Sequence, residues 1–208
     1  IEFEHVSFRY DGAEKDALHD ISLQIRPGEH IAFVGPSGGG KTTLARLVAR
    51  FADASQGEIR IGGANVKEIH QKALMDMVSF VFQDSRLLKT SILENVRLGR
   101  PEATREQVLA ALEAAQCMDI VEKLPQGIDT VVGAKGVYLS GGEQQRIAIA
   151  RVMLKDAPII ILDEATAFAD PDNESRVQAA FAQLCRGKTV LMIAHRLSTV
   201  VNTDEIFV

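Results

Sequence analysis

The sequence predicts an α/β fold with a mostly parallel sheet, and three stretches of the chain support that class. His30–Val34 is a short apolar run typical of a buried strand, and a glycine-rich loop connects it to a helical apolar pattern over residues 42–51. Residues 159–162 form an unbroken apolar run, which is typical of the middle of a parallel sheet. Thr189–Ala194 is predicted as the next strand, after a helix that begins near Pro171. Strands and helices that alternate in this way predict a parallel core.

The N-terminal part of the chain predicts an antiparallel β part. Residues 1–10 alternate between apolar and polar types and are rich in residues that favour strands, and residues 17–25 repeat the pattern. Short strands are also predicted at residues 57–61, which a Gly62-Gly63 turn follows, and at residues 78–82, which form a mainly apolar run that ends at Gln83.

Residues 91–153 have a different, helical pattern. The spacings of Ser91 with Glu94 and of Thr104 with Gln107 are those of helix capping boxes. Helical content that is collected inside an α/β chain predicts an inserted helical lobe. We therefore expect a single domain over residues 1–208, in which 1–90 and 154–208 form the core with its β part and 91–153 form the lobe.

The composition narrows the class of protein. Apolar residues make up 46% of the 208 residues, which predicts a real core and argues against disorder. The net charge of −5 argues against nucleic acid as a partner, since a phosphate backbone requires a basic face. Cys117 and Cys185 lack metal-ligand spacing and are expected to be reduced thiols in a cytosolic setting. No apolar run approaches the ~20 residues of a membrane span. The missing initiator Met and the strand-like last residues indicate a piece of a larger protein.

The loop after His30–Val34 matches the phosphate-binding pattern G-x-x-x-x-G-K-[ST] at every fixed position. Its residues are Gly35, Pro36, Ser37, Gly38, Gly39, Gly40, Lys41 and Thr42. Glycines let backbone N–H groups converge on phosphate oxygens, and a helix starting at Lys41 adds its positive end. The pattern places Lys41 at the β- and γ-phosphates and the Thr42 hydroxyl on Mg²⁺. The alternative, a glycine-rich turn that matches by accident, is disfavoured by the strand before it and the helix after it.

A second glycine-rich segment, Leu139-Ser140-Gly141-Gly142-Glu143, precedes a helix that we expect to reach about residue 155. Ser140 and Glu143 have capping-box spacing, so the segment has a purely structural explanation. The alternative is an anion site, because small residues at a helix N-terminus leave several N–H donors open. Two glycines in a first helical turn cost about 1 kcal/mol each, which favours close approach of a ligand.

Polar side chains follow several predicted strands. Asp163 and Glu164 end the apolar run at 159–162, Gln83 follows residues 78–82, and His195 follows Thr189–Ala194. Ligands of parallel sheets collect at the carboxyl ends of the strands, so Asp163 and Glu164 are expected near Thr42. A paired acidic turn, a solvated Gln and a structural His are the alternatives. Tyr10, at the end of the first strand, is either a partly buried edge aromatic or a ring that stacks on a purine.

In these residues the chain resembles the ATP-hydrolysing domain of ABC transporters. The resemblance covers essentially the whole chain, with the phosphate loop, the LSGGE segment, the acidic strand end and His195 in the family's order and spacing. The phosphate loop alone would not single out this family, whereas LSGGE beside it does. The resemblance implies a P-loop NTPase core with an inserted helical lobe.

The resemblance also implies a role for each motif. Tyr10 would stack on adenine, and the loop residues together with Thr43 would wrap the phosphates of ATP. Thr42, Gln83 and Asp163 would hold Mg²⁺, with Asp163 acting through the metal's outer shell. Glu164 would be the general base or orient water, and His195, Gln83 and Lys41 would complete the catalytic set. Ser140, Gly141 and Gly142 would reach the ATP of a second copy of the domain.

The segments QDSRLLKTSILEN (83–95) and TVVGAKG (130–136) resemble the exporter-type subfamily. That resemblance implies a membrane domain fused ahead of the chain, a second ATPase domain as partner, and a location at the cytoplasmic face of the cell membrane. Glu143, Ala134 and the Ala167-Phe168-Ala169 segment depart from the family pattern, but no catalytic position is lost. A soluble ABC ATPase of translation or DNA repair, or a non-hydrolysing regulatory subunit, are the alternative functions.

Overall fold

The computed structural model describes residues 1–82, 86–133, 137–163, 171–194 and 203–208. The chain forms two compact units. The first, which we call the sheet unit, comprises Ile1–Ser79, Pro158–Glu164 and Gly187–Val208. The second, the helical unit, comprises Phe80–Ala157 and Ala165–Arg186. The helix after residue 170 therefore clusters with the helical unit, whereas the sequence placed it with the core. The organisation as a single domain stays a prediction.

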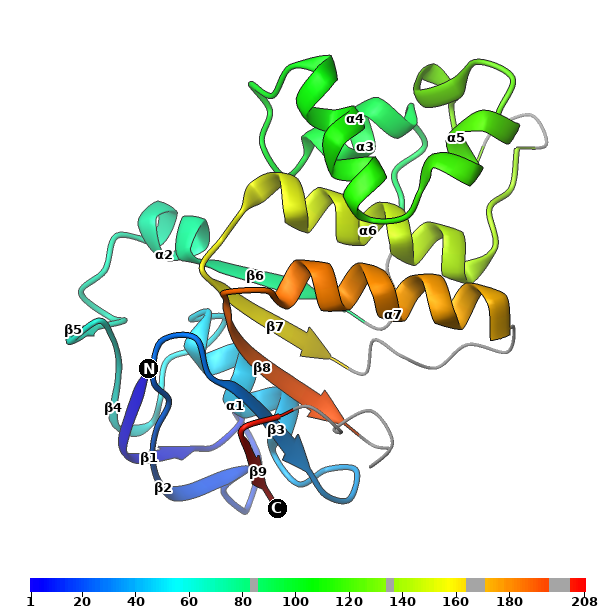
Figure 1. The fold of residues 1–208 in the computed structure, drawn as a ribbon. Coiled ribbons are helices and arrows are strands. Elements are labelled where there is room, and N and C mark those ends of the chain that lie inside the picture. The colour runs from blue at the N-terminus through cyan, green and yellow to red at the C-terminus, as the bar shows by residue number, and fades with distance from the viewer. Residues whose placement is uncertain (83–85, 134–136, 164–170, 195–202) are drawn as a thin grey trace. The chain divides into compact units, whose positions relative to one another are not determined.

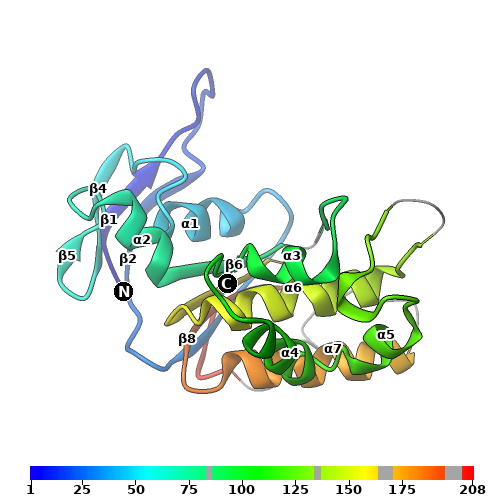
Figure 2. The ribbon, with the colours of Figure 1, turned by 90° about the horizontal axis from the view of Figure 1, so that it is seen from above.

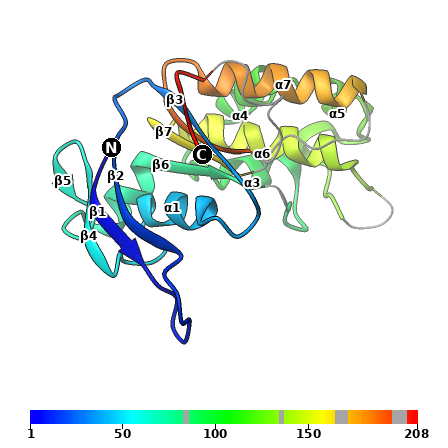
Figure 3. The ribbon, with the colours of Figure 1, turned by 90° about the horizontal axis from the view of Figure 1, so that it is seen from below.

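An antiparallel sheet forms the N-terminal part of the sheet unit, as the sequence predicted. Its strand order is β2-β1-β4-β5, and its bounds are β1 (Glu2–Phe8), β2 (Leu18–Gln24), β4 (Gln56–Ile61) and β5 (Ala64–Asn65). Figure 3 shows β1 lying beside β2. Phe3, Val6 and Phe8 of β1 are buried. Val6 and Phe8 follow the alternation of a strand, whereas the spacing of three from Phe3 to Val6 coincides with a register shift against β2 and a positive φ of 51° at His5. The short β5 carries no signal in the sequence.

The second sheet of the fold has the order β6-β7-β8-β3-β9 (Figure 1). Its strands are β3 (His30–Val34), β6 (Val78–Val81), β7 (Ile159–Asp163), β8 (Thr189–Ala194) and β9 (Glu205–Phe207). β3 pairs in parallel with β8 and β9, and β7 pairs in parallel with β8. Ile31, Ile160 and Leu191 are fully buried, as expected for central strands. The mostly parallel sheet is confirmed.

Two helices belong to the sheet unit, α1 (Lys41–Val48) and α2 (Gln71–Met77). The helix predicted over residues 42–51 ends earlier, because Arg50 has a positive φ of 53° that leaves helical geometry. Phe51, the last apolar residue of that pattern, is 54% exposed. The sequence did not predict α2, whose N-cap is His70 rather than one of the usual capping residues.

The helical unit is built around α6 (Gly141–Lys155), which packs against α3, α4 and α7 (Figure 2). The remaining elements are α3 (Ile92–Arg97), α4 (Arg105–Ala114), α5 (Met118–Lys123), the 3-10 turn η1 (Gly127–Asp129) and α7 (Pro171–Cys185). Thr104 and Gln107 form the predicted capping box of α4, whereas Ser91 caps α3 by accepting from the Glu94 N–H and the Glu94 carboxylate bonds Arg97. Ile147 and Ile149 of α6 are fully buried. Cys117 and Cys185 are buried, and within the described residues neither forms a disulfide. Among the described residues, no helix has the length and apolar character that crossing a membrane requires.

Candidate functional site

The glycine-rich loop joins the end of β3 to the start of α1. Gly38 and Gly40 have φ values of 83° and 84°, a conformation that a side chain would strain. A Cβ on Gly40 would also lie 2.5 Å from the carbonyl oxygen of Ala17. The loop geometry therefore requires glycine at position 40 both for its backbone angles and for the close approach of the segment around Ala17.

The N-terminus of α1 is open to an anion. Gly40 is the N-cap and provides no side-chain cap. Within the described residues, the N–H groups of Lys41, Thr42 and Thr43 donate no hydrogen bond to the protein. Uncapped donors at the positive end of a helix are the usual arrangement for binding phosphate. The residues of the loop therefore fit a phosphate group.

Lys41 lies across the loop. Its Nζ donates hydrogen bonds to the carbonyl oxygens of Gly35 at 2.9 Å and of Pro36 at 2.8 Å. The Lys41 amine therefore lies over the glycine-rich loop that precedes α1. A flexible ammonium in this position is suited to neutralise a phosphate oxygen.

Thr42 and Asp163 lie together, as the sequence predicted from the meeting of parallel strand ends. The Thr42 hydroxyl donates to Asp163 Oδ1 at 3.3 Å. A hydroxyl and a carboxylate are hard oxygen donors of the kind that Mg²⁺ accepts alongside phosphate oxygens and water. Among the described residues, no group of three or more His, Cys, Asp and Glu side chains could hold a metal on its own. The donors here fit a metal that arrives with phosphate ligands.

Tyr10 comes from the end of β1 to the same place. A cavity of about 280 Å³ is lined by Tyr10, Ala17, Ser37, Gly38, Gly39, Gly40, Lys41, Thr42 and Thr43. The Tyr10 hydroxyl is 2.8 Å from Thr43 Oγ1, and its ring meets Phe8 edge-on with centroids 4.8 Å apart. With 47% of its surface exposed, Tyr10 is partly buried, and its hydroxyl contact with Thr43 restrains the side chain. Its ring is a candidate stacking surface next to the phosphate loop.

The LSGGE segment opens α6 with the capping box that its spacing predicted. Ser140 Oγ accepts from the Glu143 N–H at 3.3 Å, and Glu143 Oε2 accepts from the Ser140 N–H at 2.8 Å. The structural explanation of this spacing is therefore correct. The N–H groups of Gly141 and Gly142 nevertheless have no acceptor among the described residues. The helix end is thus capped and still has two donors for an anion.

Three predicted site residues, Gln83, Glu164 and His195, lie outside the described residues. The same holds for Ala134 and for the Ala167-Phe168-Ala169 departure. Their roles stay predictions from the sequence.

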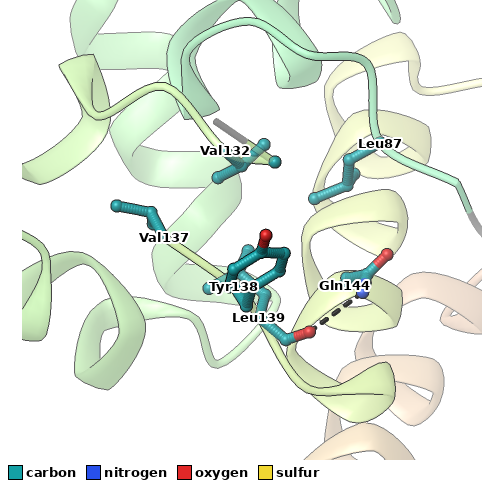
Figure 4. A pocket seen from close by; sticks show the side chains of 7 residues that line it. Leu87, Val132, Val137, Tyr138, Leu139 and Gln144 are labelled. Atoms are coloured by element: carbon teal, nitrogen blue, oxygen red, sulfur yellow. Dashed lines mark hydrogen bonds between the residues drawn. The ribbon is translucent and has the colours of Figure 1, made fainter. Parts of the chain in front are cut away.

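A second, small cavity lies in the helical unit, directly before α6 (Figure 4). Its volume is about 90 Å³, and its lining consists of Leu87, Val132, Gly133, Val137, Tyr138, Leu139 and Gln144. Gln144 Nε2 donates to the Leu139 carbonyl oxygen at 2.9 Å. Tyr138 is 83% exposed, which is high for an aromatic ring. The cavity is mainly apolar and is adjacent in sequence to Ser140.

Comparison with known families decides the class of protein. The sequence pattern of the family described as "ABC transporter" matches residues 18–167, which is more than half of the chain. The chain belongs to the ABC transporter family. The family match implies that the chain binds ATP, and the loop and helix end described above are the parts of this ABC transporter chain that fit phosphate.

Relatives with assigned names place this ABC transporter chain beside exporters. It is 51% identical over its full length to an ATP-dependent lipid A-core flippase of Alkalilimnicola ehrlichii. It is 47% identical to a putative multidrug export ATP-binding/permease protein of Staphylococcus aureus. Among solved structures, a bacterial Atm1-family ABC exporter with ATP bound matches 99% of the chain with a TM-score of 0.89 and 41% identity. The chain spans 36% of the length of each of these proteins.

Sequence reasoning missed several residues of this ABC transporter chain that shape the site. Ala17 touches the phosphate loop through its backbone carbonyl, which no residue type could signal. Arg146 is 1% exposed in α6 and bonds Asn173 of α7 at 3.3 Å. Arg146 is a charged residue next to the apolar positions of the predicted helix, and this could have indicated a buried ion pair.

Proposed function

We propose that this chain is the ATP-hydrolysing, nucleotide-binding domain of an ABC exporter, which drives transport when two such domains close on ATP. The observation that carries the proposal is the uncapped N-terminus of α1, which follows the phosphate loop. Beside it, the Thr42 hydroxyl lies 3.3 Å from Asp163 Oδ1. The exporter assignment is supported by the 51% and 47% identical relatives, both of which are named for export or flipping.

The triphosphate of ATP binds at the loop and at the start of α1. The N–H groups of Lys41, Thr42 and Thr43 face its oxygens, and the Lys41 amine exchanges its carbonyl acceptors for phosphate. Because a charged acceptor bonds more strongly than a neutral carbonyl, this exchange is favourable. The remaining loop residues from Gly35 to Gly40 shape the main chain around the phosphates, and the ring of Tyr10 lies where it can stack on the base.

Mg²⁺ supplies charge neutralisation at the β- and γ-phosphates when it is bound. Thr42 would ligate the ion directly, and Asp163 would hold its water shell from the end of β7. Gln83, which follows β6 in sequence, is proposed as a further contact to the ion or to the attacking water.

Hydrolysis requires mainly positioning and electrostatic stabilisation, because phosphoryl transfer leaves little covalent chemistry for the protein. Glu164 is proposed to take the proton of the attacking water or to orient it, and His195 to contact the γ-phosphate. The change Glu164→Gln keeps the shape of the side chain and removes its basicity, so it is proposed to block turnover without blocking binding.

The start of α6 is proposed to complete the site of a second copy. Gly141 and Gly142 offer two unpaired N–H donors, and Ser140 offers a hydroxyl. In the proposed dimer these groups bind the γ-phosphate of the ATP that the partner chain holds. The capping box fixes the turn that presents them.

A membrane domain is the second proposed partner, fused ahead of the chain and holding it at the cytoplasmic face of the cell membrane. Support comes from the relatives, which are membrane exporters of which the chain spans 36%. The cavity before α6 is small and mainly apolar, and is suited to one apolar side chain of that domain. Tyr138 and Leu139 line this cavity (Figure 4). A side chain bound in it would therefore contact the segment that directly precedes Ser140.

The phosphate loop assignment is tested by the change Lys41→Ala. We expect at least about a tenfold loss in ATP affinity, because a hydrogen bond to a charged group is worth about 1.5–3 kcal/mol. Isothermal titration calorimetry with ATP measures it. Lys72→Ala is the matched control, since Lys72 is exposed on α2 and pairs with Asp76 at 2.8 Å. Equal affinity of the Lys41 variant and the parent would refute the assignment.

A further inference from the structure

The guanidinium of Arg146 lies in the interior of the helical unit, with its side chain only 1% exposed. Its Nη1 donates to Asp119 Oδ1 at 2.8 Å and to the Gln116 carbonyl oxygen, and its Nη2 donates to Asp119 Oδ2 at 3.3 Å. Gln116 has a positive φ of 59°, which is uncommon for a residue with a side chain. A buried charge is tolerated only when it is paired, so Asp119 and the Gln116 carbonyl oxygen are needed to compensate the charge of Arg146.

Asp119 is held in its ionised form by two arginines. Arg176 Nη1 of α7 lies 2.5 Å from Asp119 Oδ2. Burial alone would raise the pKa of Asp119, but the hydrogen bond and charge of Arg146 and the charge of Arg176 outweigh burial and lower it. The Asp119 carboxylate therefore stays ionised near neutral pH between the two guanidinium groups.

Arg146 also reaches the first turn of α7. Its Nη2 donates to Asn173 Oδ1 at 3.3 Å. The same Asn173 side chain packs on the first turn of α6, because a Cβ at position 142 would lie 3.0 Å from Asn173 Cβ and 3.1 Å from its Cγ. Glycine at 142 thus admits Asn173. One asparagine connects the start of α6 with the start of α7 and is itself bonded by the buried guanidinium.

We propose that Arg146 and Asn173 are positioning residues that hold the first turn of α6 in the orientation required to bind the partner's ATP. The inference rests on the proposed function, in which Ser140, Gly141 and Gly142 contact that ATP. Donors in a catalytic site must be held within a fraction of an ångström, and such precision comes from supporting contacts. Neither Arg146 nor Asn173 touches the nucleotide in this arrangement.

The same helix provides a matched comparison. Arg151 Nε donates to the Asn95 carbonyl oxygen at 2.8 Å, and its Nη2 to Asn95 Oδ1 at 3.3 Å. Arg151 therefore also anchors α6, but to α3 and ~15 Å along the helix from Gly141 at 1.5 Å per residue. A change at Arg151 disturbs the helical unit without changing the supports of the first turn.

The experiment measures ATP-driven dimer formation by sedimentation velocity in chains that carry Glu164→Gln, which blocks turnover. Arg146→Lys, Asn173→Ala and Arg151→Lys are added singly, and the Tm and the ATP affinity of the monomer are measured for each. Arg146→Lys keeps the charge but cannot reach Asp119, Gln116 and Asn173 together. We expect about tenfold weaker dimerisation for Arg146→Lys and Asn173→Ala, the equivalent of one hydrogen bond at about 1.4 kcal/mol.

The expected pattern separates positioning from simple stability. We expect the ATP affinity of the monomer to equal the parent's in every variant. We expect Arg151→Lys to dimerise within about twofold of the parent, even if its Tm falls as far as the Tm of the other two variants. The inference is overturned if Asn173→Ala dimerises as tightly as the parent. It is also overturned if the loss of dimer affinity is in proportion to the fall in Tm in all three variants. If Arg146→Lys does not fold, Asn173→Ala decides. If the Glu164→Gln parent itself fails to dimerise with ATP, the proposed function fails first, and this inference with it.

Discussion

At the scale of single residues, Tyr10 is the clearest case of a side chain brought to the site from a distant part of the sequence. Its hydroxyl lies 2.8 Å from Thr43 Oγ1, which fixes the ring beside the phosphate loop. From the sequence alone a partly buried edge aromatic was the stronger alternative for Tyr10. With 47% of the residue exposed, Tyr10 is partly buried, and its ring lines the cavity of the loop, so stacking on a purine stays a prediction.

The change Tyr10→Ala should weaken ATP binding, whereas Tyr10→Phe should retain most of it. The reason is that stacking of a base on an aromatic ring contributes about 1–3 kcal/mol, which is roughly five- to hundredfold in affinity. Titration with a fluorescent ATP analogue measures the two constants. Phe51→Ala is the control, since Phe51 is an exposed aromatic residue after α1. Full affinity in Tyr10→Ala would show that the base binds elsewhere.

Glu164→Gln should bind ATP with the parent's affinity and lose at least about a hundredfold in turnover, within the range by which general bases accelerate reactions. Release of phosphate from Mg²⁺-ATP measures the rate, and calorimetry measures the affinity. A variant that hydrolyses ATP at the parent's rate would remove Glu164 from the mechanism.

At the scale of elements, local chemistry predicted helix starts better than helix ends. The capping spacings of Thr104 with Gln107 and of Ser140 with Glu143 are real capping boxes in α4 and α6. The end of α1 was placed three residues too late, because Phe51 continued the apolar pattern beyond the turn at Arg50. α2 was missed, since it has one buried side chain, Leu74, and therefore almost no apolar period.

The ion pair that joins α5, α6 and α7 predicts a pH dependence of stability. The pKa of Asp119 is lowered in the fold despite burial, because of Arg146 and Arg176. A lowered pKa means that the stabilisation is complete above the ordinary value of about 4 and is lost as the pH falls through the folded value. The chain should therefore lose stability in acid more steeply than its Asp119→Asn variant.

At pH 7 Asp119→Asn should cost about 1.5–3 kcal/mol of unfolding free energy, the value of a hydrogen bond to a charged group. Urea unfolding between pH 7 and pH 3 measures both effects. Asp129→Asn is the matched control, because Asp129 pairs with Arg105 at the surface with half of each side chain exposed, and such pairs contribute little. Parallel curves for the parent and Asp119→Asn would contradict the account.

At the scale of the whole molecule, the sheet class and the meeting of Thr42 with Asp163 followed from one physical rule. The apolar runs at β3, β7 and β8 require a buried parallel sheet, and parallel neighbours bring their carboxyl ends to one edge. Contacts that depend on the three-dimensional path of the chain had no such rule. The carbonyl of Ala17 against Gly40 and the bond of Arg146 to Asn173 join residues whose spacing in sequence carries no information.

The roles of Gln83, Glu164 and His195 are supported by the position of each residue after a strand and by membership of the ABC transporter family. Arg146 and Asn173 differ from them, since neither belongs to the motifs from which the site residues were predicted. Their contribution is mechanical, and it appears only when the first turns of α6 and α7 are seen to meet through one side chain.

The central claim is that hydrolysis takes place in a site made by two copies of this chain. The most direct test is the rate of ATP hydrolysis measured at saturating Mg²⁺-ATP over a wide range of protein concentration. A shared site predicts a rate that rises with about the square of the concentration while most of the protein is monomeric, and a lower rate per chain on dilution. A rate strictly proportional to concentration, down to the lowest dilution, would contradict it.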